Sequence, residues 1–142
     1  MIKNKYELLE HTADIGIRVK GKDLKEIFIN SALAMFDIIA QRKSEINEIE
    51  SSLPHIIKEQ SDDWEQLFVN WLNELLSLSA TKDLIFYDFE IEKLDGKNLE
   101  AKVWGEDIRN YNVNTEIKAA TYHQLKIENK GLYWEAEVIF DV

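Results

Sequence analysis

One stretch of the chain constrains the fold most strongly, because its apolar residues recur at the spacing of a single helix face. Intervals of three and four residues place side chains in a stripe along an α-helix, and such a stripe packs on a hydrophobic core. Asp62 and Glu65 fit the residues that cap the start of this helix. The aromatic residues of the stripe are therefore expected in the core. The stripe consists of Trp64, Leu67, Phe68, Trp71, Leu75 and Leu78.

A strand and a second helix precede this segment. Residues 15–19 alternate between apolar and other side chains, which predicts a half-buried strand that Gly21 ends. Asp23 and Glu26 then form a capping box that opens a helix. The apolar face of that helix consists of Leu24, Ile27, Phe28, Met35, Ile38 and Ile39.

The remaining segments predict antiparallel strands. Asp95-Gly96 is a strong hairpin turn signal between two alternating stretches. Two helices among such strands predict an α+β fold, with one two-layer domain over residues 1–142 and both helices packed on a largely antiparallel β-sheet. The segments are two short strands within 44–60 interrupted near Pro54, strands at 87–91 and 99–103, a polar loop at 105–114, and a final strand pair at 117–127 and 132–140.

The charge of the chain restricts its partners. Its 142 residues include 27 acidic and 17 basic side chains, so the net charge is -10. Such a surface repels phosphate backbones, and we expect no direct high-affinity binding of nucleic acid. A basic protein or a hard cation suits it better. With no cysteine, thiolate metal sites and disulfides are excluded. No apolar run reaches the length of a membrane span, so we expect a cytoplasmic protein without membrane association.

The final strand pair brings Lys118 and Asp141 together. The apolar positions are odd in its first strand and even in its second, and opposed residues share a face. A turn near Asn129–Gly131 then places either Lys118 or Ala120 opposite Asp141. In both cases Lys118 and Asp141 are expected close together on the same, non-core face. Val142 adds oxygen atoms beside Asp141, and hard cations such as Mg²⁺ or Ca²⁺ prefer such ligands. The alternative is a solvated aspartate that forms a plain cross-strand ion pair with Lys118.

Two histidines and a second aspartate complete the candidate residues. His123 has the parity of the core-facing positions, so a structural role is expected. Asp14 has the parity of Gly16 and Arg18 and leaves the core face, but the residues alone do not bring it to Asp141. His11 lies three residues before Asp14 and is a possible supporting residue.

Four stretches together resemble the archease family. They read HTADIG at 11–16, WLNELL at 71–76, EIKAATYH at 116–123 and AEVIFDV at 136–142. Their order and spacing are similar to those of the family, and they cover the whole chain. The resemblance implies an archease-like domain, a divalent metal bound by Asp14, Asp141 and Val142, and partner activation through Lys118, Asp141 and Asp14. His123 matches a family motif position without a defined role.

The resemblance also implies a partner, an RNA ligase of the RtcB type that acts in tRNA splicing and RNA repair. This ligase joins 2′,3′-cyclic phosphate or 3′-phosphate ends to 5′-hydroxyl ends, through a histidine guanylated with GTP and divalent metal. An archease is implied to promote guanylylation and multiple turnover, and is an activator rather than an enzyme. Many relatives carry a histidine before the Ile-Lys-Ala motif, whereas this chain reads Arg109-Asn110-Tyr111-Asn112. Two alternatives remain, a metal-dependent hydrolase that uses Asp14 and Asp141, and a chaperone-like adaptor.

Overall fold

The two predicted helices are present in the computed structural model, which describes residues 6–9, 13–46 and 52–142. Helix α1 spans Leu24–Ile39, and the Asp23 side chain accepts a hydrogen bond from the Glu26 amide at 2.9 Å, as the capping box predicts. Helix α2 spans Trp64–Lys82. The sequence placed its cap one residue too early, since Asp63 is the N-cap and accepts from the Gln66 amide at 2.8 Å. Both helices therefore begin with a side chain that satisfies an otherwise unpaired amide.

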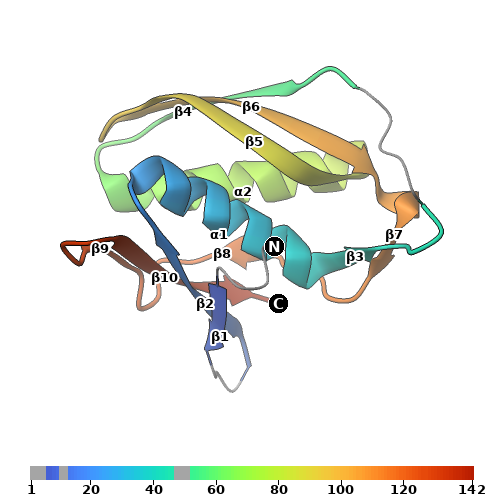
Figure 1. The fold of residues 1–142 in the computed structure, drawn as a ribbon, viewed down its shortest axis with the longest axis horizontal. Helices are drawn as coiled ribbons and strands as arrows, with labels where there is room; N and C mark the ends of the chain where they lie inside the picture. Colours follow the sequence, from blue (N-terminus) through green and yellow to red (C-terminus); the bar gives the residue numbers. More distant parts are fainter. Residues whose placement is uncertain (1–5, 10–12, 47–51) are drawn as a thin grey trace.

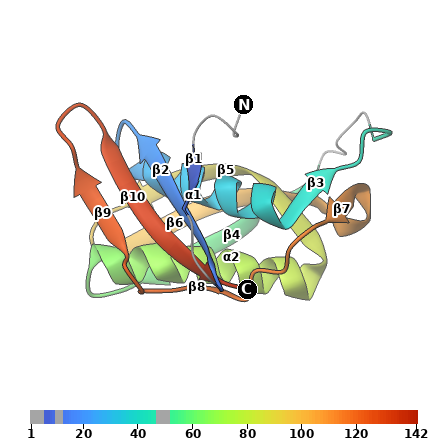
Figure 2. The same cartoon turned by 90° about the horizontal axis from the view of Figure 1, so that it is seen from below.

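The larger sheet has five strands, all antiparallel, with β10 in its middle. Strand β10 (Trp134–Asp141) pairs with β2 (Ile15–Gly21) on one side, and β1 (Tyr6–Leu9) continues the sheet beyond β2. On its other side β10 pairs first with β9 (Lys126–Asn129) and then with β8 (Ala119–Ala120). Figure 2 shows β10 between β2 and β9, with its C-terminal end beside β8.

The smaller sheet is an antiparallel three-stranded unit in the order β4-β6-β5. It contains β4 (His55–Gln60), β5 (Leu84–Leu94) and β6 (Asn98–Asp107). The predicted hairpin at Asp95-Gly96 is confirmed, because the Asp95 amide donates to the Asn98 carbonyl at 3.0 Å. Strand β4 follows Pro54 as expected, whereas the earlier strand of the predicted pair is not found among the described residues of 44–60.

The segment predicted as a polar loop is structured. Strand β6 continues to Asp107, a short 3-10 helix covers Ile108–Asn110, and β7 (Tyr111–Val113) pairs with β3 (Ala40–Arg42). Polar side chains in this segment are paired with one another, so a lack of apolar periodicity did not mean a lack of structure.

The two helices lie between the two main sheets, as Figure 1 shows. Helix α1 contacts β2 and β10 of the larger sheet and β5 of the smaller one, and α2 contacts β8, β4 and β5. The α+β class is thus confirmed, but the single sheet that we expected is divided in two with the helices as a middle layer. Most residues of the predicted helix stripes lie in the core or pack against it, with Leu24 as an exception. The Trp71 indole nitrogen donates to the Phe28 carbonyl at 2.9 Å between the helices. Among the described residues, no helix has the length and apolarity that crossing a membrane requires.

The last strand pair differs from its prediction at both turns. Residues 130–133 form the connection before β10, and Leu132, which was expected in the core, is 97% exposed there. A second turn around residues 123–124 separates β8 from β9, with Gln124 in the left-handed region at φ 52°. Asn129 is opposite Trp134, and Ala120 is opposite Phe140. Between these two pairs, the segment that contains β8 and β9 runs over nine residues, whereas β10 runs over only six. Three residues therefore leave the ladder, and the parity of the pairing changes.

Candidate functional site

The C-terminal end of β10 carries Asp141, whose Cα partner on β8 is Ala119. The Lys118 amide donates to the Asp141 carbonyl at 2.7 Å, so Lys118 lies next to Asp141 as expected. Both predicted registers are nevertheless wrong, because Ala119 is the residue opposite Asp141. The predicted shared face is wrong as well, since alternation along β8 assigns the face of Asp141 to Ala119 rather than to Lys118. Because three residues leave the ladder between β8 and β9, the partner of Asp141 is Ala119, which lies between the two predicted partners.

Asp14 reaches the same end of the sheet through β2. The ladder between β2 and β10 ends with Ile15 opposite Phe140. Asp14 directly precedes Ile15 and Asp141 directly follows Phe140, so the two aspartates occupy the next position on each strand. The sequence alone did not bring Asp14 to Asp141. The pairing of β2 with β10, two strands far apart in the sequence, places them next to each other.

Both aspartates belong to the face of the larger sheet that turns away from the helices. Residues on that face alternate with the core positions Ile17 and Val138, which are fully buried. Further along the face, charges are paired, and the Arg18 guanidinium contacts Glu137 at 2.9 Å. Hydrogen bonding to Glu137 is the main cause that raises the pKa of Arg18 above its ordinary value. The middle of this face therefore carries an ion-pair network in which Arg18 contacts Glu7, Glu135 and Glu137.

The end of the face has no such ion pairs among the described residues. Within the described residues, neither the Asp14 nor the Asp141 carboxylate forms an ion pair, and Lys118 forms none either. The plain Lys118–Asp141 ion pair considered from the sequence is thus not formed. Adjacent carboxylates repel each other, and a cation between them relieves this repulsion.

The donor set suits a hard cation that keeps much of its water. Asp14 and Asp141 supply carboxylates, and Val142 supplies main-chain oxygen, which Mg²⁺ and Ca²⁺ prefer over nitrogen or sulfur. In the described part of the chain no three His, Cys, Asp or Glu side chains gather as a metal site would require. The residues present therefore fit a cation held by few protein ligands, and they do not fit a closed site made of side chains.

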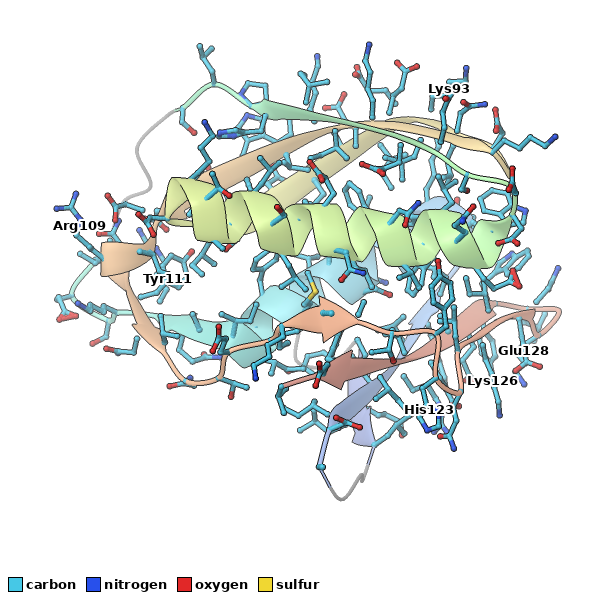
Figure 3. All side chains as sticks on the ribbon, turned by 180° about the vertical axis from the view of Figure 1, so that it is seen from behind. Lys93, Arg109, Tyr111, His123, Lys126 and Glu128 are labelled. Atoms are coloured by element: carbon cyan, nitrogen blue, oxygen red, sulfur yellow. The ribbon has the colours of Figure 1, made fainter. Side chains whose placement is uncertain are left out.

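Neither of the two candidate histidines is placed by the structure beside the aspartates. His123 was expected to face the core, but it is exposed in the turn between β8 and β9, and Figure 3 shows its side chain at the outside of the molecule. The turn interrupts the alternation on which the prediction depended. His11 lies outside the described residues.

A second polar cluster surrounds Glu106, to which sequence reasoning assigned no role. Its side chain is 5% exposed and accepts hydrogen bonds at both oxygens. Oε1 receives Arg42 Nε at 2.8 Å and the Tyr111 hydroxyl at 3.1 Å, while Oε2 receives Arg42 Nη2 at 2.8 Å and Asn110 Nδ2 at 2.9 Å. The hydrogen bond from Arg42 is the main cause that lowers the pKa of Glu106, and burial followed by the charge of Glu106 raises the pKa of Tyr111. This cluster joins β3, β6 and β7 and is structural in character.

The chain is similar to the members of a known protein family along almost its whole length. A model of the Archease protein family (MTH1598/TM1083) matches residues 6–142. The archease of Pyrococcus furiosus is 40% identical over 143 residues, which cover 96% of this chain and 98% of that protein. The archease of Sulfurisphaera tokodaii is 37% identical over 142 residues, which cover 97% and 99% of the two chains.

Solved structures agree with these relatives. The solution structure of Methanobacterium thermoautotrophicum protein 1598 has a TM-score of 0.80, 32% identity and full coverage of both chains. The crystal structure of a Thermotoga maritima protein, described as an archease and possible chaperone, has a TM-score of 0.65, 25% identity and 96% coverage of each chain. With a family model that spans nearly its whole length and relatives that share more than a third of its residues, the chain belongs to the archease family.

Proposed function

We propose that this protein activates an RNA ligase of the RtcB type by docking the end of its larger sheet against the ligase. One observation carries the proposal: Asp14, Lys118 and Asp141 come from separate stretches, and their main chains lie side by side where β2 and β8 flank the end of β10. Among the described residues, none of the three side chains forms an ion pair, so their charges remain available to a partner or a cation.

The charges of this end suit a ligase that uses GTP and divalent metal. Asp14 and Asp141, with an oxygen of Val142, would hold Mg²⁺ or Ca²⁺, and the bound ion would supply positive charge at the docking face. Lys118 contributes a flexible cation that contacts a phosphate or orients Asp141. The overall charge of -10 favours encounter with a basic surface and disfavours unaided binding to RNA. In this proposal the chain is an activator and carries out no step of the ligation itself.

A ligation assay with the ligase of the same organism in substoichiometric amount tests the activator role. Wild-type protein should raise the product well above one turnover per ligase. Asp141→Ala and Lys118→Ala should abolish this stimulation and leave the circular dichroism spectrum unchanged, because Asp141 and Lys118 are exposed. Asp62→Ala and Lys126→Ala replace exposed residues of the same types elsewhere and should stimulate fully. Product that stays at one turnover per ligase with wild-type protein refutes the proposal.

The same preparation separates an activator from a stand-alone hydrolase. Without ligase, release of phosphate or cleavage of RNA that disappears in Asp14→Ala would favour the hydrolase. Titration calorimetry with Ca²⁺ and Mg²⁺ tests the cation site independently of any ligase. Binding by wild type and loss of binding in Asp141→Ala are expected, and equal heats from both proteins would exclude Asp141 as a ligand.

A further inference from the structure

Strand β8 is the least supported part of the candidate site. It has only two residues, Ala119 and Ala120, and its pairing with β10 covers only those two. Main-chain groups of successive strand residues point to opposite sides. The amide of the adjacent residue Thr121 donates to the Ile139 carbonyl of β10 at 3.0 Å. The amide and carbonyl of Ala120 accordingly face the other way, where the sheet offers no further strand.

The Asn73 side chain of α2 occupies the place of the missing strand. Its Oδ1 accepts a hydrogen bond from the Ala120 amide at 2.7 Å, and its Nδ2 donates to the Ala120 carbonyl at 3.2 Å. A carboxamide carries one acceptor and one donor group in a plane, as a peptide unit does, so it satisfies both main-chain groups at once. Figure 2 shows β8 running beside α2, which makes this contact the lateral support of the strand.

The position of Asn73 in its helix strengthens this interpretation. Its neighbours Leu72, Leu75 and Leu76 are buried in the core, and Asn73 is half-buried among them. An apolar residue at this position would leave the nearly buried Ala120 with an unpaired amide and carbonyl. The hydrogen bonds from Asn73 to Ala120 on β8 therefore explain why a polar residue occurs within an apolar helix segment.

We propose that Asn73 is the positioning residue of the Lys118–Asp141 site, holding β8 so that Lys118 stays next to Asp141. Within the described part of the chain, the Asn73 side chain forms hydrogen bonds only with Ala120, two residues from Lys118, and so acts through the strand. The two hydrogen bonds between the Asn73 side chain and Ala120 are called the clamp on β8. The role of Asn73 in activation rests on the proposed function, whereas the clamp does not.

Amide hydrogen exchange measured by NMR tests the clamp without any ligase. Asn73→Ala removes both hydrogen bonds and should speed exchange at Ala120 and Lys118 by about tenfold or more. Exchange at Val138, in the centre of the sheet, should not change. Asn70→Ala, one turn earlier on α2, is the matched control and should leave all of these rates as they are. Equal rates at Ala120 in wild type and Asn73→Ala, or a uniform rise across the protein, would overturn the clamp.

Asn73→Asp covers the case in which alanine disturbs the fold. It keeps the shape and the acceptor but replaces the donor, so an oxygen faces the Ala120 carbonyl. Its exchange rate at Ala120 should lie between those of wild type and Asn73→Ala. A rate equal to that of wild type would show that the donor of Asn73 does not hold the strand.

The ligation assay tests what the clamp is for. At saturating concentration, Asn73→Ala should lower the maximal stimulation, and in a Lys118→Ala background it should lower it no further, because both changes act on one element. If both single variants reduce stimulation and their effects multiply, Asn73 acts by another route and the inference fails. If wild type does not stimulate at all, the proposed function fails, and the exchange rates still decide on the clamp.

Discussion

Replacing Glu106 with glutamine is expected to weaken the corner where β3, β6 and β7 meet. A glutamine has the shape of the native side chain, but one of its acceptor oxygens becomes an NH₂ group that donates. Each carboxylate oxygen receives one nitrogen of Arg42. Whichever oxygen is replaced, one arm of the guanidinium then faces another donor, and the charge that attracts it is gone.

The magnitude follows from these contacts. A hydrogen bond to a charged group contributes about 1.5–3 kcal/mol, and breaking a buried ion pair costs about 3–5 kcal/mol. Glu106 is almost fully buried, so water does not replace the lost partner, but the hydroxyl of Tyr111 is able to rotate and accept. We therefore expect Glu106→Gln to lower the free energy of unfolding by about 3 kcal/mol at pH 7. Urea unfolding followed by tryptophan fluorescence measures this change, with an unaltered slope.

Asp107 supplies the control, because it is the next residue and also pairs with an arginine. Its carboxylate contacts Arg109 at 2.8 Å, but the Arg109 side chain is 86% exposed. Asp107→Asn should therefore give no resolvable change in urea unfolding. A loss below about 1 kcal/mol for Glu106→Gln, or an equal loss for both variants, would refute the reasoning from burial.

Two further predictions concern the helix cap and acid stability. Asp63→Ala should lower the free energy of unfolding by about 1 kcal/mol through loss of the α2 cap, while Asp62→Ala, at the position expected from the sequence, should have no resolvable effect in the same urea titration. The folded-state pKa of Glu106 lies below its ordinary value of 4.5, so its contribution to stability is complete above that value and is lost as the pH falls through the folded pKa. Thermal unfolding of wild type should consequently drop more steeply below pH 4.5 than that of Glu106→Gln, and parallel curves would contradict this.

The elements that could be predicted from the sequence are those specified by local chemistry. Helix periodicity, the capping box at Asp23 and the turn at Asp95-Gly96 each depend on residues within a few positions of one another, and all three are present. The turn between β8 and β9 has no Gly or Pro to mark it, and Gln124 adopts a left-handed conformation that its residue type seldom does. The sequence therefore predicted one continuous alternating strand. Because the turn interrupts it, the predicted register at Asp141 and the predicted direction of the His123 side chain were both wrong.

The candidate site could be predicted only as far as one hairpin reaches. Lys118 and Asp141 belong to neighbouring segments, and the proximity of their main chains is confirmed, whereas the predicted shared face is not. The place of Asp14 depends on the pairing of β2 with β10, which no local signal encodes. The Glu106 cluster was missed for the same reason, since its arginine comes from β3, far away in the sequence. For Asn73 a signal did exist, in the form of a polar residue within an apolar helix segment.

The central place of β10 in the larger sheet also affects how the protein is made. Arg18 and Glu137, which face each other across the seam between β2 and β10, are 119 residues apart in the sequence. A nascent chain presents β1 and β2 long before the strand that joins them to β8 and β9 leaves the ribosome. Until then β2 has an open edge that is able to pair with other chains, and closing so long a loop is slow. The two helices and the smaller sheet are complete earlier, so the seam that assembles the Asp14–Asp141 end is expected to close last.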